Sequence, residues 1–174
     1  MIIKHFLPSF CLAFYLSAFF GCAALAQQNS IKEQIVGAWT LVSIVNDAPD
    51  GSKIEIFGSA PKGTIIFSAD GHFSLFQSRA EIPKIAANDR AKVAPEEAIA
   101  IVGSLIAYYG SYSVNETDKT ISVKIEGSSY ANLAGGPEQK RIITSLTADE
   151  LKFTNPRTPT GATLQTSWKR AKAS

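Results

Sequence analysis

Cysteine is almost absent from this chain. The two cysteines, Cys11 and Cys22, both lie within the first 26 residues, and the sequence from Gln27 onward contains none. This part of the chain therefore cannot form disulfides, zinc–thiolate sites or a thiol-based active site. A domain without cross-links depends on its hydrophobic core for stability, and this one is long enough to bury such a core.

The chain also has few histidines and a net charge close to zero. His72 is the single histidine after residue 26, and no closely spaced carboxylates accompany it. The sequence therefore predicts no metal site and no cofactor, and no motif marks a catalytic nucleophile. Lys and Arg total 17 against 15 Asp and Glu, a net charge of +2. Nucleic-acid-binding proteins show a strong basic excess or a basic stripe, so we expect no nucleic-acid partner.

Residues 1–26 have the three parts of a secretory signal peptide. These parts are a basic start at Lys4 and His5, an apolar run over Leu12–Phe20, and the small-x-small cleavage site Ala24-Leu25-Ala26. The apolar run is shorter than the roughly 20 residues that a membrane helix needs. We therefore expect a periplasmic or secreted protein whose mature domain is residues 27–174.

Two alternatives to this cleavage remain open. Phe19-Phe20-Gly21-Cys22 is similar to a bacterial lipoprotein box, in which Cys22 would carry the lipid and attach the protein to a membrane. An uncleaved anchor helix is the other alternative.

Beyond the leader, short apolar runs separated by Gly, Asp, Asn and Pro indicate β-strands. They span Ile35–Val45, Ile54–Phe57, Thr64–Ser68, His72–Ser78, Gly110–Val114, Ile121–Glu126, Arg141–Leu146, Glu150–Thr154 and Thr163–Arg170. Apolar and polar residues alternate, as in Ile121, Val123 and Ile125, which indicates one face on a core and one in water. Many short strands joined by tight turns predict an all-β, antiparallel up-and-down barrel or a sandwich.

One segment breaks this pattern. Pro95-Glu96-Glu97 is typical of a helix start, with proline in the first turn and acids near the positive end of the helix. The apolar residues that follow share one helical face: Ala98, Ile101, Val102, Leu105 and Tyr109. We expect a helical insertion over Pro95–Tyr109 that plugs or flanks the sheet and covers one mouth, with a mobile lid as the alternative.

Several segments together resemble a known family. Gly37-Ala38-Trp39 matches the G-x-W motif that opens lipocalin barrels, and further matching segments follow in order: Gly63–Gly71, Tyr109–Val114, Lys124–Ser129, Glu138–Arg141, Leu151–Pro156 and Trp168-Lys169-Arg170. They resemble the bacterial and fungal lipocalin-like domain family, although Lys124 and Leu133 replace a common His and a common aromatic residue. The resemblance implies a calyx-shaped barrel in which Arg170 stacks on Trp39 by a cation–π contact.

A barrel of eight strands can hold one small ligand, so inward-facing side chains are the candidate site. We predict that Phe73, Tyr112 and Trp168 line the wall. Arg141 and Glu126, on neighbouring strands, either orient a ligand carboxylate or carbonyl or form a surface cross-strand pair, which we favour. Arg79 shares the alternation of Phe73 and could also point inward.

Three functions fit these observations. The first is binding of a small apolar or amphipathic molecule, which would be the partner. The second is an isomerase or cyclase that folds its substrate in the barrel, with Tyr112, Arg141 or Glu126 as acid–base groups. The third is an envelope interaction protein whose barrel is filled by its own side chains. The volume of the interior distinguishes the third from the other two.

The leader gives a direct prediction. Export should remove residues 1–26, so N-terminal sequencing of the exported protein should begin at Gln27. A lipid-modified Cys22 at the N-terminus would replace this result by membrane attachment, and an exported protein that still begins at Met1 would contradict both.

Overall fold

The computed structural model describes residues 29–48, 50–156, 158 and 161–172. The predicted signal peptide and both cysteines lie outside these residues. The strands are β1 (Gly37–Asp47), β2 (Lys53–Glu55), β3 (Lys62–Phe67), β4 (His72–Ser78), β5 (Leu105–Asn115), β6 (Thr120–Ser128), β7 (Gln139–Leu146), β8 (Glu150–Asn155) and β9 (Leu164–Arg170). The helices are α1 (Ile31–Ile35) and α2 (Pro95–Val102), with 3₁₀ turns η1 (Arg90–Lys92) and η2 (Ala131–Leu133).

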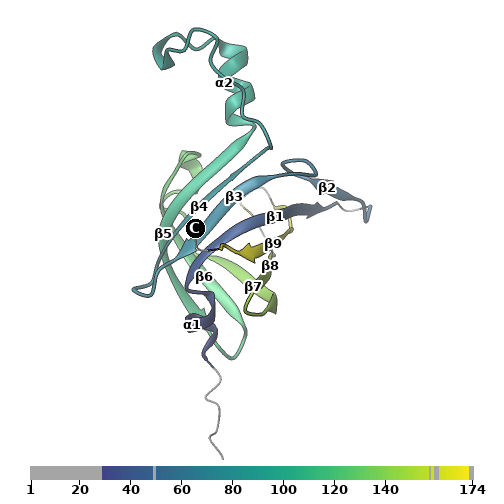
Figure 1. Cartoon of the computed structure of the whole chain (residues 1–174), viewed down its shortest axis with the longest axis vertical. Helices are drawn as coiled ribbons and strands as arrows, with labels where there is room; N and C mark the ends of the chain where they lie inside the picture. The colour runs from purple at the N-terminus through teal and green to yellow at the C-terminus, as the bar shows by residue number, and fades with distance from the viewer. Residues whose placement is uncertain (1–28, 49, 157, 159–160, 173–174) are drawn as a thin grey trace, which may run out of the picture.

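The strands of the described residues form one antiparallel sheet that closes on itself. Its order is β2-β1-β3-β4-β5-β6-β7-β8-β9, and β1 also pairs with β9 from Trp39↔Arg170 to Asn46↔Leu164. β2 pairs with the end of β1 outside this ring, so eight strands make the barrel (Figure 1). Closure removes the two free sheet edges that an open sheet would expose. The predicted all-β antiparallel barrel is confirmed, and its first and last long strands, β1 and β9, lie side by side.

The predicted alternation also holds in the strands. Ile121, Val123 and Ile125 of β6 are 0%, 2% and 3% exposed, whereas the intervening Lys124 and the following Glu126 are exposed. In β6, apolar side chains thus face the inside of the barrel and charged ones face outward, as the period of two requires.

One end of the barrel is closed by α1. Ser30 caps this short helix, and the Glu116 carboxylate of the β5–β6 turn accepts hydrogen bonds from the backbone N–H groups of Ile31 (2.8 Å) and Lys32 (3.0 Å). At the other end of α1, the Arg170 guanidinium donates to the carbonyls of Gln34 (2.6 Å) and Val36 (3.1 Å). A negative charge at the helix start and a positive charge at its end both favour this arrangement.

Arg170 also covers Trp39, as the family resemblance implied. Its guanidinium carbon lies 4.0 Å from the centre of the indole ring, and the buried indole N–H donates to the Ile35 carbonyl at 2.8 Å. Gly37 has a φ of +119°, and a Cβ there would lie 3.2 Å from the Arg170 Nη1. The glycine of the Gly37-Ala38-Trp39 motif therefore provides both the turn into β1 and the room for the arginine.

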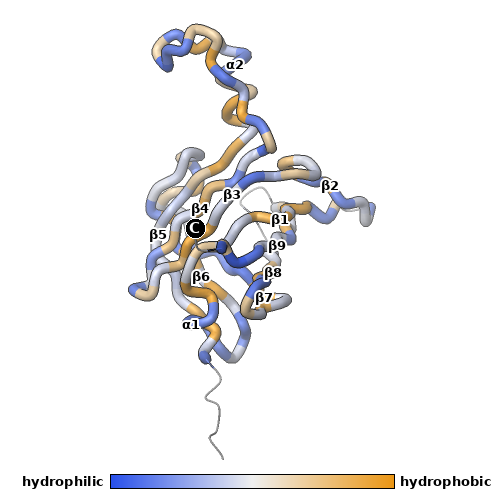
Figure 2. Tube along the Cα trace, viewed as in Figure 1, coloured by the Kyte–Doolittle hydropathy of each residue, from blue (hydrophilic) through white to orange (hydrophobic). Residues whose placement is uncertain are grey.

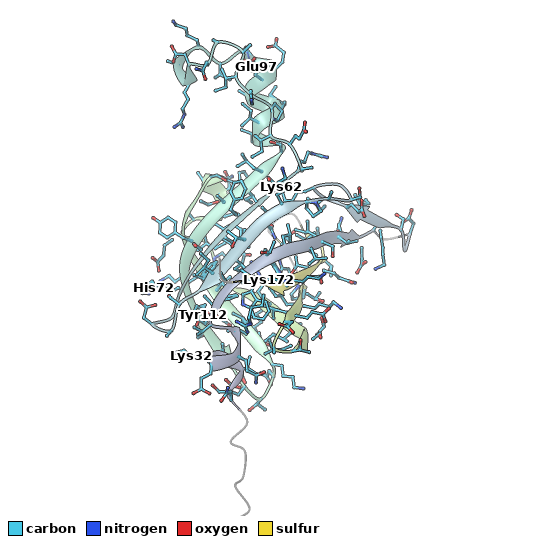
Figure 3. The ribbon with its side chains drawn as sticks, viewed as in Figure 1. Lys32, Lys62, His72, Glu97, Tyr112 and Lys172 are labelled. Carbon is cyan, nitrogen blue, oxygen red and sulfur yellow. The ribbon has the colours of Figure 1, made fainter. Side chains whose placement is uncertain are left out.

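Aromatic side chains fill the half of the barrel next to α1. Trp39 and Trp168 are fully buried, and Phe67 packs edge-on against Tyr112 with ring centres 5.0 Å apart. The Tyr112 hydroxyl, which lies in this lower half (Figure 3), donates to the Ser68 carbonyl at 2.8 Å, and burial raises the pKa of its phenol. This half of the barrel is a packed core.

The helical insertion differs from the prediction in two respects. α2 ends at Val102, and Leu105–Tyr109 belong to β5, where they pair with β4 from Ser78↔Leu105 to Ser74↔Tyr109. Their spacing fits a helix and a strand equally well, and pairing with β4 decides for the strand. α2 also does not cover the barrel. It lies on an arm, residues 79–104 between β4 and β5, that extends away from the end opposite α1 (Figure 1).

The arm leaves apolar side chains uncovered. Ile99 and Val102 are 74% and 72% exposed, and Figure 2 shows hydrophobic colour on part of this helix. Glu97, labelled on the arm in Figure 3, accepts hydrogen bonds from the backbone N–H groups of Ala86 (2.9 Å) and Ala94 (3.0 Å), which hold the pKa of its carboxyl below the usual value. The arm is thus held mainly by its own contacts.

The β3–β4 turn gathers Ser68, Asp70 and His72 outside the barrel. The Ser68 hydroxyl donates to the Asp70 carboxylate, which also lies 3.2 Å from Nδ1 of His72. His72 faces solvent (Figure 3). Because the Ser68 hydroxyl bonds the Asp70 carboxylate and the His72 backbone carbonyl, and not the imidazole, these residues stabilise a turn and do not form a Ser–His–acid triad.

Arg170 should be the most sensitive charged residue of the closed end. Arg170→Ala removes its carbonyl hydrogen bonds and its contact with Trp39, so it should lower the free energy of unfolding by about 2–3 kcal/mol. Lys169→Ala, at the adjacent exposed position, should cost under about 0.5 kcal/mol. Urea unfolding of both variants measures this, and equal losses would contradict the role of Arg170.

The β3–β4 turn should titrate at unusually low pH. The Ser68 hydroxyl, followed by His72, lowers the pKa of Asp70 from 3.8 to about 2. Because the folded pKa is depressed, the stabilisation is complete above the unfolded pKa and is lost as pH falls from about 4 to about 2. NMR titration of the Asp70 carboxyl should give a pKa near 2, rising toward its usual value in Ser68→Ala. Titration near 3.8 in the unmodified protein would show that these bonds are absent in solution.

Candidate functional site

The half of the barrel opposite α1 is not filled. It contains a cavity of about 340 Å³, within the range of small-molecule sites. Among the described residues, its lining comes from β1, β4, β5, β7, β8 and β9, from the end of α2 at Val102 and Gly103, and from the loops around the rim. The lining residues are Ile44, Ile56, Phe57, Leu75, Gln77, Val102, Gly103, Leu105, Ile106, Tyr108, Tyr130, Leu133, Gln139, Arg141, Phe153, Asn155, Thr158, Ala162, Leu164 and Thr166.

The two sides of this cavity differ in chemistry. Leu75 of β4 and Ile106 and Tyr108 of β5 form an apolar wall. The opposite strands, β7 to β9, contribute polar side chains at Gln139, Arg141, Asn155 and Thr166. An apolar surface with a few fixed polar groups is the usual composition of a site for an amphipathic small molecule.

Arg141 is the one cation among the described lining residues. Its side chain is 5% exposed, and its guanidinium donates to the Lys140 carbonyl and to the Gln139 side-chain oxygen, both at 3.1 Å. Gln139 and Arg141 are both inward because they are two residues apart on β7.

A second polar group lies on the next strand. Asn155 is 8% exposed, and its Oδ1 is buried without a hydrogen-bond partner among the described residues. Ile142 pairs with Thr154 between the antiparallel strands β7 and β8. Arg141 and Asn155, the next residue on each strand in the same direction, therefore come opposite each other. Gln77, 4% exposed, adds a polar group from β4.

The structure brings one of the five predicted ligand-binding residues to the cavity. Arg141 lines it, whereas Phe73, Tyr112 and Trp168 are buried outside its lining. Phe73 and Tyr112 both pack against Phe67, and Trp168 stacks on Phe153 with ring centres 6.2 Å apart. Alternation correctly places these three aromatic residues inside the barrel, but it carries no information about depth along the barrel axis.

The charged pair differs from the favoured prediction. Glu126 is exposed on the outside of β6, whereas Arg141 is buried inside and lies opposite Ile121 in the β6–β7 register. The predicted surface pair of Arg141 with Glu126 is therefore wrong, because the two side chains point to opposite faces of the sheet. Arg79 is also exposed: it lies just past the end of β4, where the alternation no longer applies.

Sequence analysis missed Gln77 and Asn155. Gln77 shares the inward alternation of Phe73 and Leu75, and Asn155 shares that of Leu151 and Phe153. The signal that could have identified them is a polar residue that continues the inward alternation at the end of a strand.

Two features are absent from the described residues. None of their helices has the length and apolar character to cross a membrane. No three His, Cys, Asp or Glu side chains within the described ranges lie close enough together to hold a metal ion.

This chain was compared with solved structures, curated proteins and family models. A solved structure titled as a redesigned β-barrel, mFAP1, bound to DFHBI is 15% identical over 82% of this chain and 100% of that chain, with a TM-score of 0.42. No curated protein matches this sequence. A family model described as a lipocalin-like domain matches residues 36–171, which run from just before β1 to just past β9. The chain therefore belongs to the lipocalin-like domain family.

Proposed function

We propose that this protein binds a small amphipathic molecule in the open half of its barrel. The observation that carries the proposal is the division of the interior: aromatic side chains pack the half next to α1, and the other half holds a cavity of about 340 Å³. Core side chains normally fill their space at close packing, so a cavity of this size with one polar side fits a ligand site.

The energetics allow useful affinity. Each 100 Å² of apolar ligand surface removed from water contributes about 2.5 kcal/mol. A ligand that contacts Leu75, Ile106 and Tyr108 on one side and the polar strands on the other can offset the cost of association and bind at about micromolar strength.

The other two candidate functions have less support. A barrel filled by its own side chains does not agree with the cavity. For the isomerase or cyclase, only Arg141 of the three proposed acid–base residues lines the cavity, since Tyr112 and Glu126 lie outside it. The described lining includes the phenols of Tyr108 and Tyr130 but no carboxylate and no histidine. Arg141 alone is a poor acid–base group because a guanidinium stays protonated.

The proposal includes export. The signal-peptide pattern of residues 1–26 supports a periplasmic or secreted location, and Cys22 remains the alternative point of attachment to a membrane. A carrier outside the cytoplasm would meet its ligand in a dilute aqueous phase, where an apolar cavity offers the ligand a favourable environment.

Filling the cavity should abolish binding. N-phenyl-1-naphthylamine, a neutral apolar probe whose fluorescence rises on leaving water, should bind the unmodified protein saturably at one site. Ile106→Trp replaces an aliphatic side chain with a larger indole ring in the cavity. It should weaken binding at least about tenfold, a loss of about 1.4 kcal/mol. Fluorescence titration measures both constants.

The matched control is Ile142→Trp, because Ile142 is 41% exposed on the outer face of β7. This variant should bind the probe as the unmodified protein does. Absence of saturable binding, or equal binding by the two tryptophan variants, would contradict a ligand site in the barrel.

A further inference from the structure

We propose that the ligand is an apolar molecule with a carboxylate, and that Arg141 binds this carboxylate inside the barrel. The inference rests on the proposed function and adds the chemical class of the ligand and the residue that selects it.

The first argument is a buried cation without a counter-ion. All 15 aspartates and glutamates of the chain lie in the described residues, and none has an oxygen within 4.0 Å of the Arg141 guanidinium. A buried charge is costly unless it is paired, because it loses its hydration. The 5% exposure of Arg141 therefore leaves a charge that an anion entering the cavity would compensate.

The second argument is the supply of free donors. A guanidinium has five N–H groups in a planar fork. Arg141 donates to the backbone carbonyl of Lys140 and to the side-chain oxygen of Gln139, two uncharged acceptors on its own strand. The other N–H groups are available to a ligand, and a carboxylate can accept two of them in parallel.

The third argument is the polar neighbour. Asn155, next to Arg141 across the β7–β8 pairing, has a buried Oδ1 without a partner among the described residues. Unpaired buried polar atoms are uncommon in folded proteins. Its place across the sheet from Arg141 marks this part of the wall as the place for the polar end of a ligand, including a hydroxyl that would donate to Asn155.

The lining also favours a carboxylate over a phosphate. Arg141 is the single cation among the described lining residues, and that lining includes no N-terminus of an α-helix. One guanidinium neutralises one negative charge, whereas a phosphate monoester carries nearly two near neutral pH. The apolar body of the ligand would then extend toward Leu75, Ile106 and Tyr108 on the opposite wall.

Calorimetric titration of matched ligands tests the inference on the mature protein. The pairs are decanoate with 1-decanol, and 2-naphthylacetate with 2-naphthylacetamide, at pH 7.5, where both acids are ionised. Each carboxylate should bind at least about tenfold more tightly than its neutral partner, because only the carboxylate pairs with the fork.

Two substitutions identify the residue. Arg141→Gln should remove the preference for the carboxylates and leave binding of the neutral partners within about threefold. Lys140→Gln makes the same change of charge at the adjacent exposed position of β7 and should keep the full preference. Arg141→Lys should retain part of it, because an ammonium attracts the anion without the planar fork. If Arg141→Gln fails to fold, the unmodified protein and Arg141→Lys decide the test.

The outcomes separate this inference from the proposed function. Equal binding of neutral and charged partners by the unmodified protein would overturn the carboxylate assignment and leave the cavity as an apolar site. Equal losses in Arg141→Gln and Lys140→Gln would show a general effect of charge and would overturn the role of Arg141. Binding of none of the four probes would overturn both proposals.

Discussion

This barrel closes where β1 pairs with β9, and at the α1 end of that seam Arg170 contacts both Trp39 and α1. The rest of the structure depends on this closure. Trp39 lies at the start of β1 and Arg170 at the end of β9, so the contact is made across the seam where the two ends of the sheet meet. The same guanidinium bonds two carbonyls at the end of α1, while Glu116 bonds its start. One arginine therefore couples the seam to the cover of the closed end.

Closing one end leaves the two halves of the interior with different tasks. Near α1, the buried rings of Trp39, Phe67 and Tyr112 make close contacts and supply stability. Toward the other end, the strands carry Gln77, Arg141 and Asn155 on their inner faces, and these polar groups cannot pack into an apolar core without loss. Stability therefore resides in the first half, and the second half is free to hold a ligand.

The sequence predicts the strands well and the depth of the barrel poorly. His72–Ser78 is a strand with the predicted bounds, because a glycine turn precedes it and its alternation is regular. Leu105–Tyr109 is ambiguous between helix and strand, and only pairing with β4 settles it. Trp168 and Arg141 both alternate inward on their strands, yet one is in the core and the other in the cavity. That difference depends on how the strands are staggered around the barrel, which no single strand encodes.

The favoured pairing of Arg141 with Glu126 fails for a related reason. A buried arginine is expected to have an acidic partner, and the sequence places Glu126 on a neighbouring strand, so a surface pair is favoured over a buried charge. In the structure the arginine is buried and the glutamate points outward. The family model spans the barrel strands, and Arg141 is the one cation among the described residues that line the cavity.

Native mass spectrometry of the protein purified from its own host, under conditions that keep bound molecules in place, tests the ligand proposal most directly. The protein should carry one small molecule, released on denaturation and identified by its fragments as an apolar carboxylate; the Arg141→Gln protein prepared in the same way should lack it. A protein that is free of any small molecule, or one that carries a neutral ligand retained by Arg141→Gln, would contradict the carboxylate site.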